Sequence, residues 1–307
     1  MDKAKYIWMD GEFKGWDEAN VHILTHTLHY GNGVFEGTRA YPTPKGLAIF
    51  KLQEHTKRLL NSAKIVAIKP NFDQKTLEEA QLELLRKNEF SGKSSVYIRP
   101  LIYLGYGVMG LHHVKAPVNT AIAAWEWGAY LGDEGLEKGI KVKTSSIVRN
   151  SVKSTFGKAK AVANYLNSQM AKFEALEAGY EEALMVDDSG FIAEGSGECI
   201  FIVRDGVLIT PPHDNSLESI TQATVLEIAK DKGLKIEHRN ITRDEIYICD
   251  EAFFTGTAAE VTPINSLDAR VIGNGSRGKI TKMLQEAYFD IVYGRDERYD
   301  HYLTYIN

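Results

Sequence analysis

Residues 157–165 read Gly157-Lys158-Ala159-Lys160-Ala161-Val162-Ala163-Asn164-Tyr165, and the rest of the chain is organised around this stretch. An amphipathic pattern follows it, with Leu166, Met170 and Phe173 at helical spacing. A lysine just before a helix, among Ala and Gly, has room beside it for a flat ligand. A desolvated lysine can lose its proton near neutral pH and attack a carbonyl. Lys160 is therefore a candidate Schiff-base lysine, although a solvated surface position is the default for any lysine taken alone.

Length and composition favour a two-domain globular enzyme. The chain has 307 residues, of which 44% are hydrophobic and 25% charged. A net charge of -5 argues against nucleic-acid binding, and no apolar run approaches the roughly 18 residues of a membrane span. The first residues lack the pattern of an export signal. Cys199 and Cys249 are too few for a disulfide framework or a thiolate metal cluster. We therefore expect a cytoplasmic protein.

Hydrophobic periodicity and turn residues predict an α+β protein rather than a regular alternation of strands and helices. Predicted helices cover 53–65, 76–87, 221–232 and 280–293, besides the one that ends near 179. Predicted strands cover 6–13 as a hairpin, 95–104, 119–127, 140–146, 182–186, 191–193, 199–203, 207–209, 235–238, 251–255 and 261–265. Three glycines in 128–135 suggest a linker between a small N-terminal domain, 1–127, and a large C-terminal domain, 136–307, that contains the lysine.

Three familiar motifs give no functional anchor. Residues 273–278 match the dinucleotide-binding pattern GxGxxG, but they lie too near the C-terminus for a strand–helix–strand unit, so a turn into the last helix is expected. His22, His26 and His29 have helical spacing, but no HExxH glutamate or carboxylate cluster accompanies them, so we predict no metal site. A serine hydrolase has no support because GxSxG does not occur.

Two stretches in the first half combine glycine, aromatic and charged residues. Residues 29–39, His-Tyr-Gly-Asn-Gly-Val-Phe-Glu-Gly-Thr-Arg, suit a backbone that bends around a ligand with Tyr30 and Phe35 as walls, or else an aromatic-rich turn. In the predicted strand 95–104, alternation puts Tyr97 and Arg99 on one face. This pair could bind a carboxylate or could form a salt bridge within the protein.

Two further regions follow in the second half. In 192–198, Ile-Ala-Glu-Gly-Ser-Gly-Glu, Glu194 could face the nitrogen of a pyridine ring and keep it protonated, with Glu198 as the competing carboxylate and a solvated hairpin as the alternative. Thr221 opens a predicted helix whose N–H groups could hold a phosphate, and Thr257 in a second loop could add a hydroxyl. Thr221 could also be a plain helix cap.

Together these stretches resemble the branched-chain amino-acid aminotransferases, which have fold type IV of the pyridoxal-phosphate enzymes. The resemblance runs from residue 6 to the closing helix, and its most specific parts are LHYGNGVFEGTR, YIRPLIY, WGAYLG, KAKAVANYL, FIAEGSGE and FTGTAAEVTPI. It implies a two-domain α+β protein with pyridoxal 5′-phosphate as its cofactor. The implied reaction transfers the amino group of Leu, Ile or Val to 2-oxoglutarate, in ping-pong fashion through a Lys160 Schiff base. It also implies a homodimer at least, with a hexamer left open.

The resemblance assigns roles residue by residue. Lys160 matches the lysine that bonds to the cofactor, Tyr165 the tyrosine on its phenolic oxygen, and Glu194 the acid on its ring nitrogen. The phosphate contacts match Arg58, Ile220, Thr221 and Thr257. The substrate α-carboxylate matches backbone donors at Thr257 and Ala258, with Tyr97 nearby, and the distal carboxylate of glutamate matches Arg99. The side-chain pocket matches Phe35, Gly37, Trp127, Tyr130 and Ala259. Tyr30 and Val108 match positions contributed across a dimer interface.

The implied pocket chemistry is self-consistent. Aromatic walls without a fixed charge suit Leu, Ile and Val, and a charge at the rim would admit glutamate. An ion pair deep inside would instead leave a buried charge unpaired when an aliphatic substrate binds.

The sequence departs from the family pattern at two positions, and other protein classes remain possible. Ser219 replaces a glycine of many relatives, and Cys199 replaces an asparagine. D-amino-acid aminotransferases and aminodeoxychorismate lyases share the lysine and the glutamate, but the motifs at 30–39 and 97–100 favour the branched-chain type. A non-catalytic binding protein would have no reason to keep Lys160, Tyr165 and Glu194 together. The sequence leaves open the preference among Leu, Ile and Val, side activity on aromatic amino acids, and a biosynthetic or catabolic role.

Overall fold

The computed structural model describes residues 3–90, 92–128, 131–214 and 216–306. The chain forms two compact units: unit 1 contains 1–128, 158–163 and 291–307, and unit 2 contains 129–157 and 164–290. Neither unit is continuous in sequence, unlike the predicted domains 1–127 and 136–307. A linker role for 128–135 stays a prediction, and helix α4 (Asp133–Lys138) begins within that range. The mixture of helices and mainly antiparallel sheets confirms the α+β prediction.

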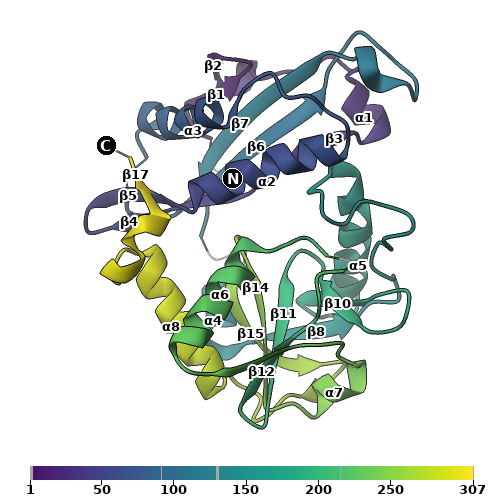
Figure 1. Cartoon of the computed structure of the whole chain (residues 1–307), viewed down its shortest axis with the longest axis vertical. Helices are drawn as coiled ribbons and strands as arrows, with labels where there is room; N and C mark the ends of the chain where they lie inside the picture. The colour runs from purple at the N-terminus through teal and green to yellow at the C-terminus, as the bar shows by residue number, and fades with distance from the viewer. Residues whose placement is uncertain (1–2, 91, 129–130, 215, 307) are drawn as a thin grey trace. The chain divides into compact units, whose positions relative to one another are not determined.

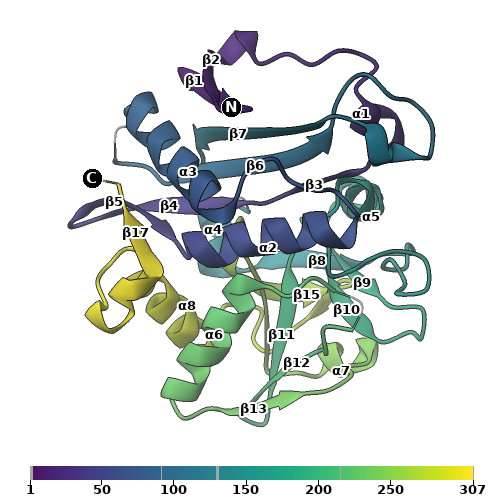
Figure 2. The same cartoon turned by 45° about the horizontal axis from the view of Figure 1, so that its top comes forward.

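Unit 1 contains a sheet with the strand order β17-β5-β4-β6-β7-β1-β2, and β3 pairs with β6 at its side (Figure 1). Its strands are β1 (Tyr6–Met9), β2 (Glu12–Gly15), β3 (Gly33–Phe35), β4 (Thr38–Thr43), β5 (Gly46–Phe50), β6 (Val96–Leu104), β7 (Val118–Glu126) and β17 (Leu303–Tyr305). Its helices are α1 (His26–Tyr30), α2 (Leu52–Ile65) and α3 (Gln74–Asn88). Figure 2 shows α2 running alongside β3 and α3 alongside β7.

The core of unit 1 follows from two periodicities. Leu59 and Ala63 of α2, and Leu77 and Leu84 of α3, are buried at helical spacing. Alternate residues of the sheet strands, such as Ile98 and Ile102 of β6, face them in one hydrophobic cluster. The helices therefore hold the strands that position the residues at 35–39 and 97–99.

Unit 2 contains a second sheet with the strand order β10-β9-β8-β15-β14-β11-β12-β13, and β16 pairs with β15. Its strands are β8 (Ile140–Thr144), β9 (Glu182–Val186), β10 (Ile192–Gly195), β11 (Cys199–Arg204), β12 (Val207–Thr210), β13 (Lys235–His238), β14 (Glu251–Gly256), β15 (Glu260–Leu267) and β16 (Arg270–Val271). Its helices are α4, α5 (Tyr165–Glu177), α6 (Ile220–Asp231), α7 (Arg243–Tyr247) and most of α8 (Lys279–Val292). Helix α5 packs on β8 and β9, and α6 packs on β13 and β14 (Figure 1).

Most predicted elements are confirmed to within one or two residues, and the differences have physical causes. Strands β4 and β5 were not predicted, because β4 contains a proline and β5 is a short apolar run without alternation. The apolar residues of α5 predicted at helical spacing are exposed, Leu166 by 64% and Phe173 by 56%, whereas Ala171 and Ala175 are buried. Residues 273–278 form a turn before α8, as expected. In the part of the chain that the structure describes, none of the helices has both the length and the apolar character needed to cross a membrane.

Candidate functional site

Lys160 is held in unit 1 by its backbone on both sides. Its carbonyl oxygen accepts a hydrogen bond from the Phe35 N–H at 3.1 Å, and its own N–H donates to Ser62 Oγ on α2 at 3.0 Å. Ala161 forms an antiparallel bridge with Val34 of β3. The side chain of Lys160 is partly buried, with Nζ 5.1 Å from the centre of the Phe35 ring, whereas Lys158 is exposed. The fold therefore distinguishes the two lysines of the stretch.

Phe35, Tyr97 and Arg99 come together beside this lysine. The Arg99 guanidinium lies 4.6 Å from the centre of the Phe35 ring, and its Nη2 donates to Tyr97 Oη at 3.1 Å. Its Nε is buried and has no hydrogen-bond partner among the described residues. Trp127 packs edge-on against Tyr97 with ring centres 4.9 Å apart. The arrangement leaves a buried cationic donor beside aromatic surface.

Gly37 makes this packing possible. An ideal Cβ at this position would lie 1.9 Å from Tyr97 Oη, far inside contact distance. The glycine predicted for the side-chain pocket is thus required by the close approach of Tyr97, and its backbone conformation alone does not demand it.

Arg58 is part of a buried network on α2. Its Nε and Nη2 donate to the two carboxylate oxygens of Glu36 at 2.6 and 2.9 Å, and His55 Nδ1 lies 2.8 Å from Glu36 Oε2. Burial raises the pKa of Glu36, but the Arg58 charge and the His55 hydrogen bond outweigh it and hold that pKa well below its usual range. Burial lowers the pKa of His55, against the opposing effect of the Glu36 carboxylate.

Glu194 lies on β10 of unit 2 and is 5% exposed. Arg149 Nε donates to Glu194 Oε1 at 2.7 Å, and Arg149 Nη1 donates to Ser168 Oγ on α5 at 3.0 Å. The guanidinium stabilises the negative charge of the carboxylate and fixes it relative to α5.

Glu198, the competing carboxylate of the same stretch, has a different environment. It is buried, and Gly197 N–H donates to its Oε2 at 3.0 Å. Burial and the nearby Glu182 carboxylate raise the pKa of Glu198 to about 8, against the opposing charge of Lys172. An ionised carboxylate is what keeps a pyridine nitrogen protonated, so the ion pair of Glu194 suits that role and the raised pKa of Glu198 does not.

Two backbone turns of unit 2 present N–H groups. Gly256 and Glu260 pair across the β14–β15 hairpin, and residues 257–259 form its tip. At the start of α6, Ser219 Oγ accepts the Gln222 N–H at 3.1 Å. The unexpected serine therefore caps the helix through the third N–H and does not use those of Ile220 and Thr221. Thr221 is buried at 2% exposure.

The remaining predicted residues are distributed as follows. Tyr30 ends α1 and is 40% exposed, and its Oη accepts the Gly110 N–H at 3.2 Å. Val108 is partly buried in the loop after β6. Tyr165 opens α5, and Ala258 and Ala259 are in the β14–β15 tip. Tyr130 lies outside the described residues. Of the histidines at helical spacing, His26 and His29 are in α1 but His22 precedes it.

Comparison with known proteins identifies the family of this chain. The family described as amino-transferase class IV matches residues 33–267. The chain belongs to the class IV aminotransferases. A branched-chain-amino-acid aminotransferase of Pseudomonas aeruginosa is 49% identical over 99% of this chain and 98% of its own length, and one of Escherichia coli K12 is 42% identical over 96% and 95%.

Solved structures of other class IV aminotransferases have the same fold. The T.th. branched-chain amino acid aminotransferase with pyridoxamine 5′-phosphate matches with a TM-score of 0.96 at 47% identity and covers 100% of both chains. The same enzyme complexed with N-(5′-phosphopyridoxyl)-L-glutamate gives a TM-score of 0.95 at 47% identity over 100% of both chains.

Three residues of this aminotransferase were not assigned a role from sequence. Glu36 lies inside the glycine-rich motif at residues 29–39. His55 stands three positions before Arg58, which puts both on one side of a helix. These two positions could have been recognised from the sequence. No sequence pattern indicates Arg149, because its partner Glu194 is 45 residues away along the chain.

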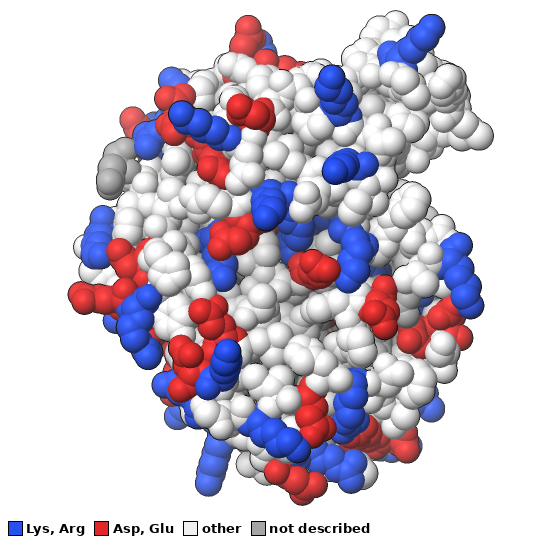
Figure 3. All heavy atoms as spheres, in the orientation of Figure 1, with Lys and Arg blue, Asp and Glu red and all other residues white. Residues whose placement is uncertain are grey.

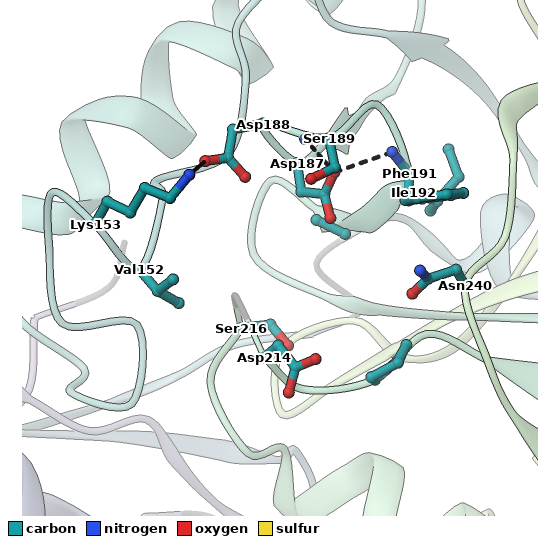
Figure 4. Close-up of a pocket in the computed structure, with 12 residues that line it drawn as sticks. Val152, Lys153, Asp187, Asp188, Ser189, Phe191, Ile192, Asp214, Ser216 and Asn240 are labelled. Carbon is teal, nitrogen blue, oxygen red and sulfur yellow. Dashed lines mark hydrogen bonds and ion pairs between the residues drawn. The ribbon is translucent and has the colours of Figure 1, made fainter.

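A separate hollow of about 320 Å³ on unit 2 is not lined by any of the described residues predicted for the site (Figure 4). Three aspartates border it, but Asp187 accepts hydrogen bonds from the N–H groups of Ser189 and Phe191, which closes the β9–β10 turn. Asp188 accepts from Ser151 and lies 3.8 Å from the Lys153 ammonium. Two of the three aspartates, Asp187 and Asp188, are thus bonded within the protein.

Proposed function

We propose that this chain catalyses transamination of branched-chain L-amino acids with 2-oxoglutarate, using pyridoxal 5′-phosphate, and that the residues named from the resemblance perform it. The observation that carries the proposal is sequence identity of 49% and 42%, over almost the full chain, to enzymes of that name. The local environments of Lys160, Glu194 and Arg58 support it. The products are branched 2-oxo acids and L-glutamate. The reaction is the last step of Leu, Ile and Val synthesis or the first step of their degradation.

The residues present fit the cofactor chemically. In unit 1, Lys160 supplies an amine on a backbone fixed by Phe35 and Ser62, and Arg58 supplies a guanidinium for the phosphate. In unit 2, Glu194 supplies a buried carboxylate that Arg149 keeps charged. The α6 N-terminus offers the N–H groups of Ile220 and Thr221, the hydroxyls of Thr221 and Thr257 add to them, and Tyr165 supplies a phenol for the ring oxygen.

When bound, pyridoxal phosphate supplies an electron-withdrawing ring that stabilises the charge left at the amino acid's Cα. Lys160 would hold the cofactor between turnovers, and its free amine would take the proton from the Cα of the substrate. Glu194, which is paired with Arg149, would hold the proton on the ring nitrogen, a role that the raised pKa of Glu198 does not suit. With 2-oxoglutarate the same residues would act in the reverse order, which would make the reaction ping-pong.

The proposed substrate contacts are those that the resemblance assigns. In unit 1, Phe35, Gly37 and Trp127 lie around Tyr97 and Arg99 and offer apolar surface for an aliphatic side chain, and the resemblance assigns Tyr130 and Ala259 to the same pocket. Arg99 receives the distal carboxylate of glutamate, which is supported by its buried Nε donor without a partner among the described residues. The backbone of Thr257 and Ala258 binds the α-carboxylate, with Tyr97 nearby.

The active form is a homodimer at least, with a hexamer open, to which Tyr30 and Val108 contribute across the interface. Around these residues, α1, the segment before it and the β6–β7 loop expose apolar side chains: Ile23, Leu28, Leu111 and Val114, by 60–87%. Figure 3 has few charged side chains in this region. Four exposed apolar side chains on these segments suit contact with a second copy of the chain. The two buried cysteines form no disulfide, which suits the reducing conditions of the cytoplasm.

An amino-donor panel with 2-oxoglutarate tests the reaction, and the absorbance of the purified protein tests the cofactor. We expect turnover of L-leucine, L-isoleucine and L-valine, and loss of both activity and cofactor absorbance in Lys160→Ala. Turnover of D-alanine but not L-leucine would overturn the substrate assignment. Retained turnover in Lys160→Ala would overturn the assignment of the lysine.

A further inference from the structure

Glu36 is a charged side chain at the centre of unit 1 that the proposed chemistry does not use. It is 0% exposed and stands between β3 and β4. Its Oε1 accepts from Arg58 Nε, and its Oε2 accepts from Arg58 Nη2, from His55 Nδ1 and, at 3.2 Å, from the Gly37 N–H. An ionised carboxylate only accepts hydrogen bonds, so His55 must present a proton on Nδ1. Every one of these partners of Glu36 therefore donates to it.

The backbone of this region leaves the carboxylate little freedom. The Glu36 N–H donates to the Pro100 carbonyl at 2.9 Å, and the preceding Phe35 N–H donates to Lys160. Helix α2 then carries His55, Arg58 and Ser62 at spacings of three and four, which places them on one side. Ser62 bonds to the Lys160 backbone. The same side of the helix thus contacts both the lysine segment and Glu36.

The bidentate bond fixes the orientation of the Arg58 guanidinium. It uses the edge of the group that contains Nε and Nη2, and the edge that bears Nη1 lies outside it. A guanidinium is planar, so two parallel bonds on one edge determine where the opposite edge points. His55 in turn holds the Glu36 oxygen that Arg58 Nη2 uses.

We propose that Glu36 and His55 are positioning residues that set the orientation in which Arg58 binds the phosphate group of the cofactor. This inference rests on the proposed function, which assigns the phosphate to Arg58. It predicts an effect confined to the phosphate. A packing role alone would weaken all ligands together or would only lower stability.

The test compares the affinity of the full-length apoenzyme for pyridoxal 5′-phosphate and for pyridoxal, which lacks the phosphate. Glu36→Gln keeps the shape but removes an acceptor from Arg58. We expect it to weaken pyridoxal phosphate binding about tenfold, the usual worth of one charge-assisted hydrogen bond, and to change pyridoxal binding less than about twofold.

Two variants of His55 keep the test valid if Glu36→Gln fails to fold. Asn can replace the Nδ1 donor of histidine, so His55→Asn should retain the preference for the phosphorylated ligand, whereas His55→Leu should lose part of it. Glu182→Gln is the matched control, because Glu182 is equally buried and paired with Lys172 at 2.6 Å. It should lower the melting temperature of the apoenzyme without changing the ratio of the two affinities.

The outcomes separate the two proposals. If the wild-type apoenzyme does not bind pyridoxal phosphate, or if Arg58→Gln leaves its phosphate preference intact, the phosphate assignment of Arg58 fails. If Arg58→Gln loses the preference while Glu36→Gln and His55→Leu keep it, only the positioning role is overturned. Equal weakening of both ligands in Glu36→Gln would also overturn it.

Discussion

Gly37→Ala tests how closely the substrate face of unit 1 is packed. The new Cβ would lie 1.9 Å from Tyr97 Oη and 2.7 Å from Tyr97 Cζ. Real Cβ atoms essentially never approach closer than 3.0 Å, so Tyr97 Oη must move by at least 1.1 Å. The residue is 5% exposed and its ring packs against both Trp125 and Trp127, with ring centres 5.1 and 4.9 Å away, so these two side chains oppose the movement.

Two quantities follow from this displacement. Overpacking of a filled site costs about 1–3 kcal/mol, which should lower the urea midpoint of unfolding. Tyr97 Oη also accepts from Arg99, so the shift disturbs the predicted carboxylate contacts. A displacement of about 1 Å in a positioning group can cost roughly 100-fold, and we expect a loss of that order in kcat/KM for L-leucine.

The control is Gly128→Ala, since no described atom lies within 4 Å of a Cβ at that position. It should leave both the urea midpoint and kcat/KM unchanged. Adding Tyr97→Phe to Gly37→Ala removes the 1.9 Å contact but leaves the one at 2.7 Å, so stability should recover only in part. The reasoning is refuted if Gly37→Ala keeps the wild-type midpoint and a kcat/KM within twofold.

Three further predictions follow from individual side chains. The raised pKa of Glu198 means that its carboxyl group keeps a proton in the folded protein which the unfolded chain releases near pH 4.5, so the stability that this proton confers is complete below pH 4.5 and is lost as the pH rises to about 8. Urea unfolding measured between pH 5 and 8 should therefore show a free energy that falls by up to about 1.4 kcal/mol per pH unit, and Glu198→Gln should remove this slope. Arg149→Met leaves the Glu194 charge buried without its ion pair, which should cost about 3–5 kcal/mol in free energy of unfolding, and a loss below about 1 kcal/mol would contradict the pairing. Arg99→Gln should raise KM for glutamate roughly tenfold or more while that for L-leucine changes little, and equal effects on both donors in steady-state kinetics would rule out a role specific to the distal carboxylate.

The sequence alone determined the element types and the chemical candidates. Helical and alternating periodicity are local properties, so α2, α3, α6, α8 and most strands could be placed without any tertiary contact. The motifs around Lys160, Glu194 and residues 29–39 could likewise be recognised, because glycines and charged residues in otherwise apolar stretches are unusual wherever they occur. Family resemblance then supplied roles that spacing could not.

Only the tertiary structure decided which charges meet. Glu36 reaches Arg58 across 22 residues and Glu194 reaches Arg149 across 45, and no local pattern encodes such pairings. The difference between Glu194 and Glu198 is also tertiary, because desolvation and neighbouring charge set the proton affinity of a carboxylate. Lys160 itself became distinct from Lys158 through the backbone bonds to Phe35 and Ser62. Sequence named the reactive groups, and packing set their charge and orientation.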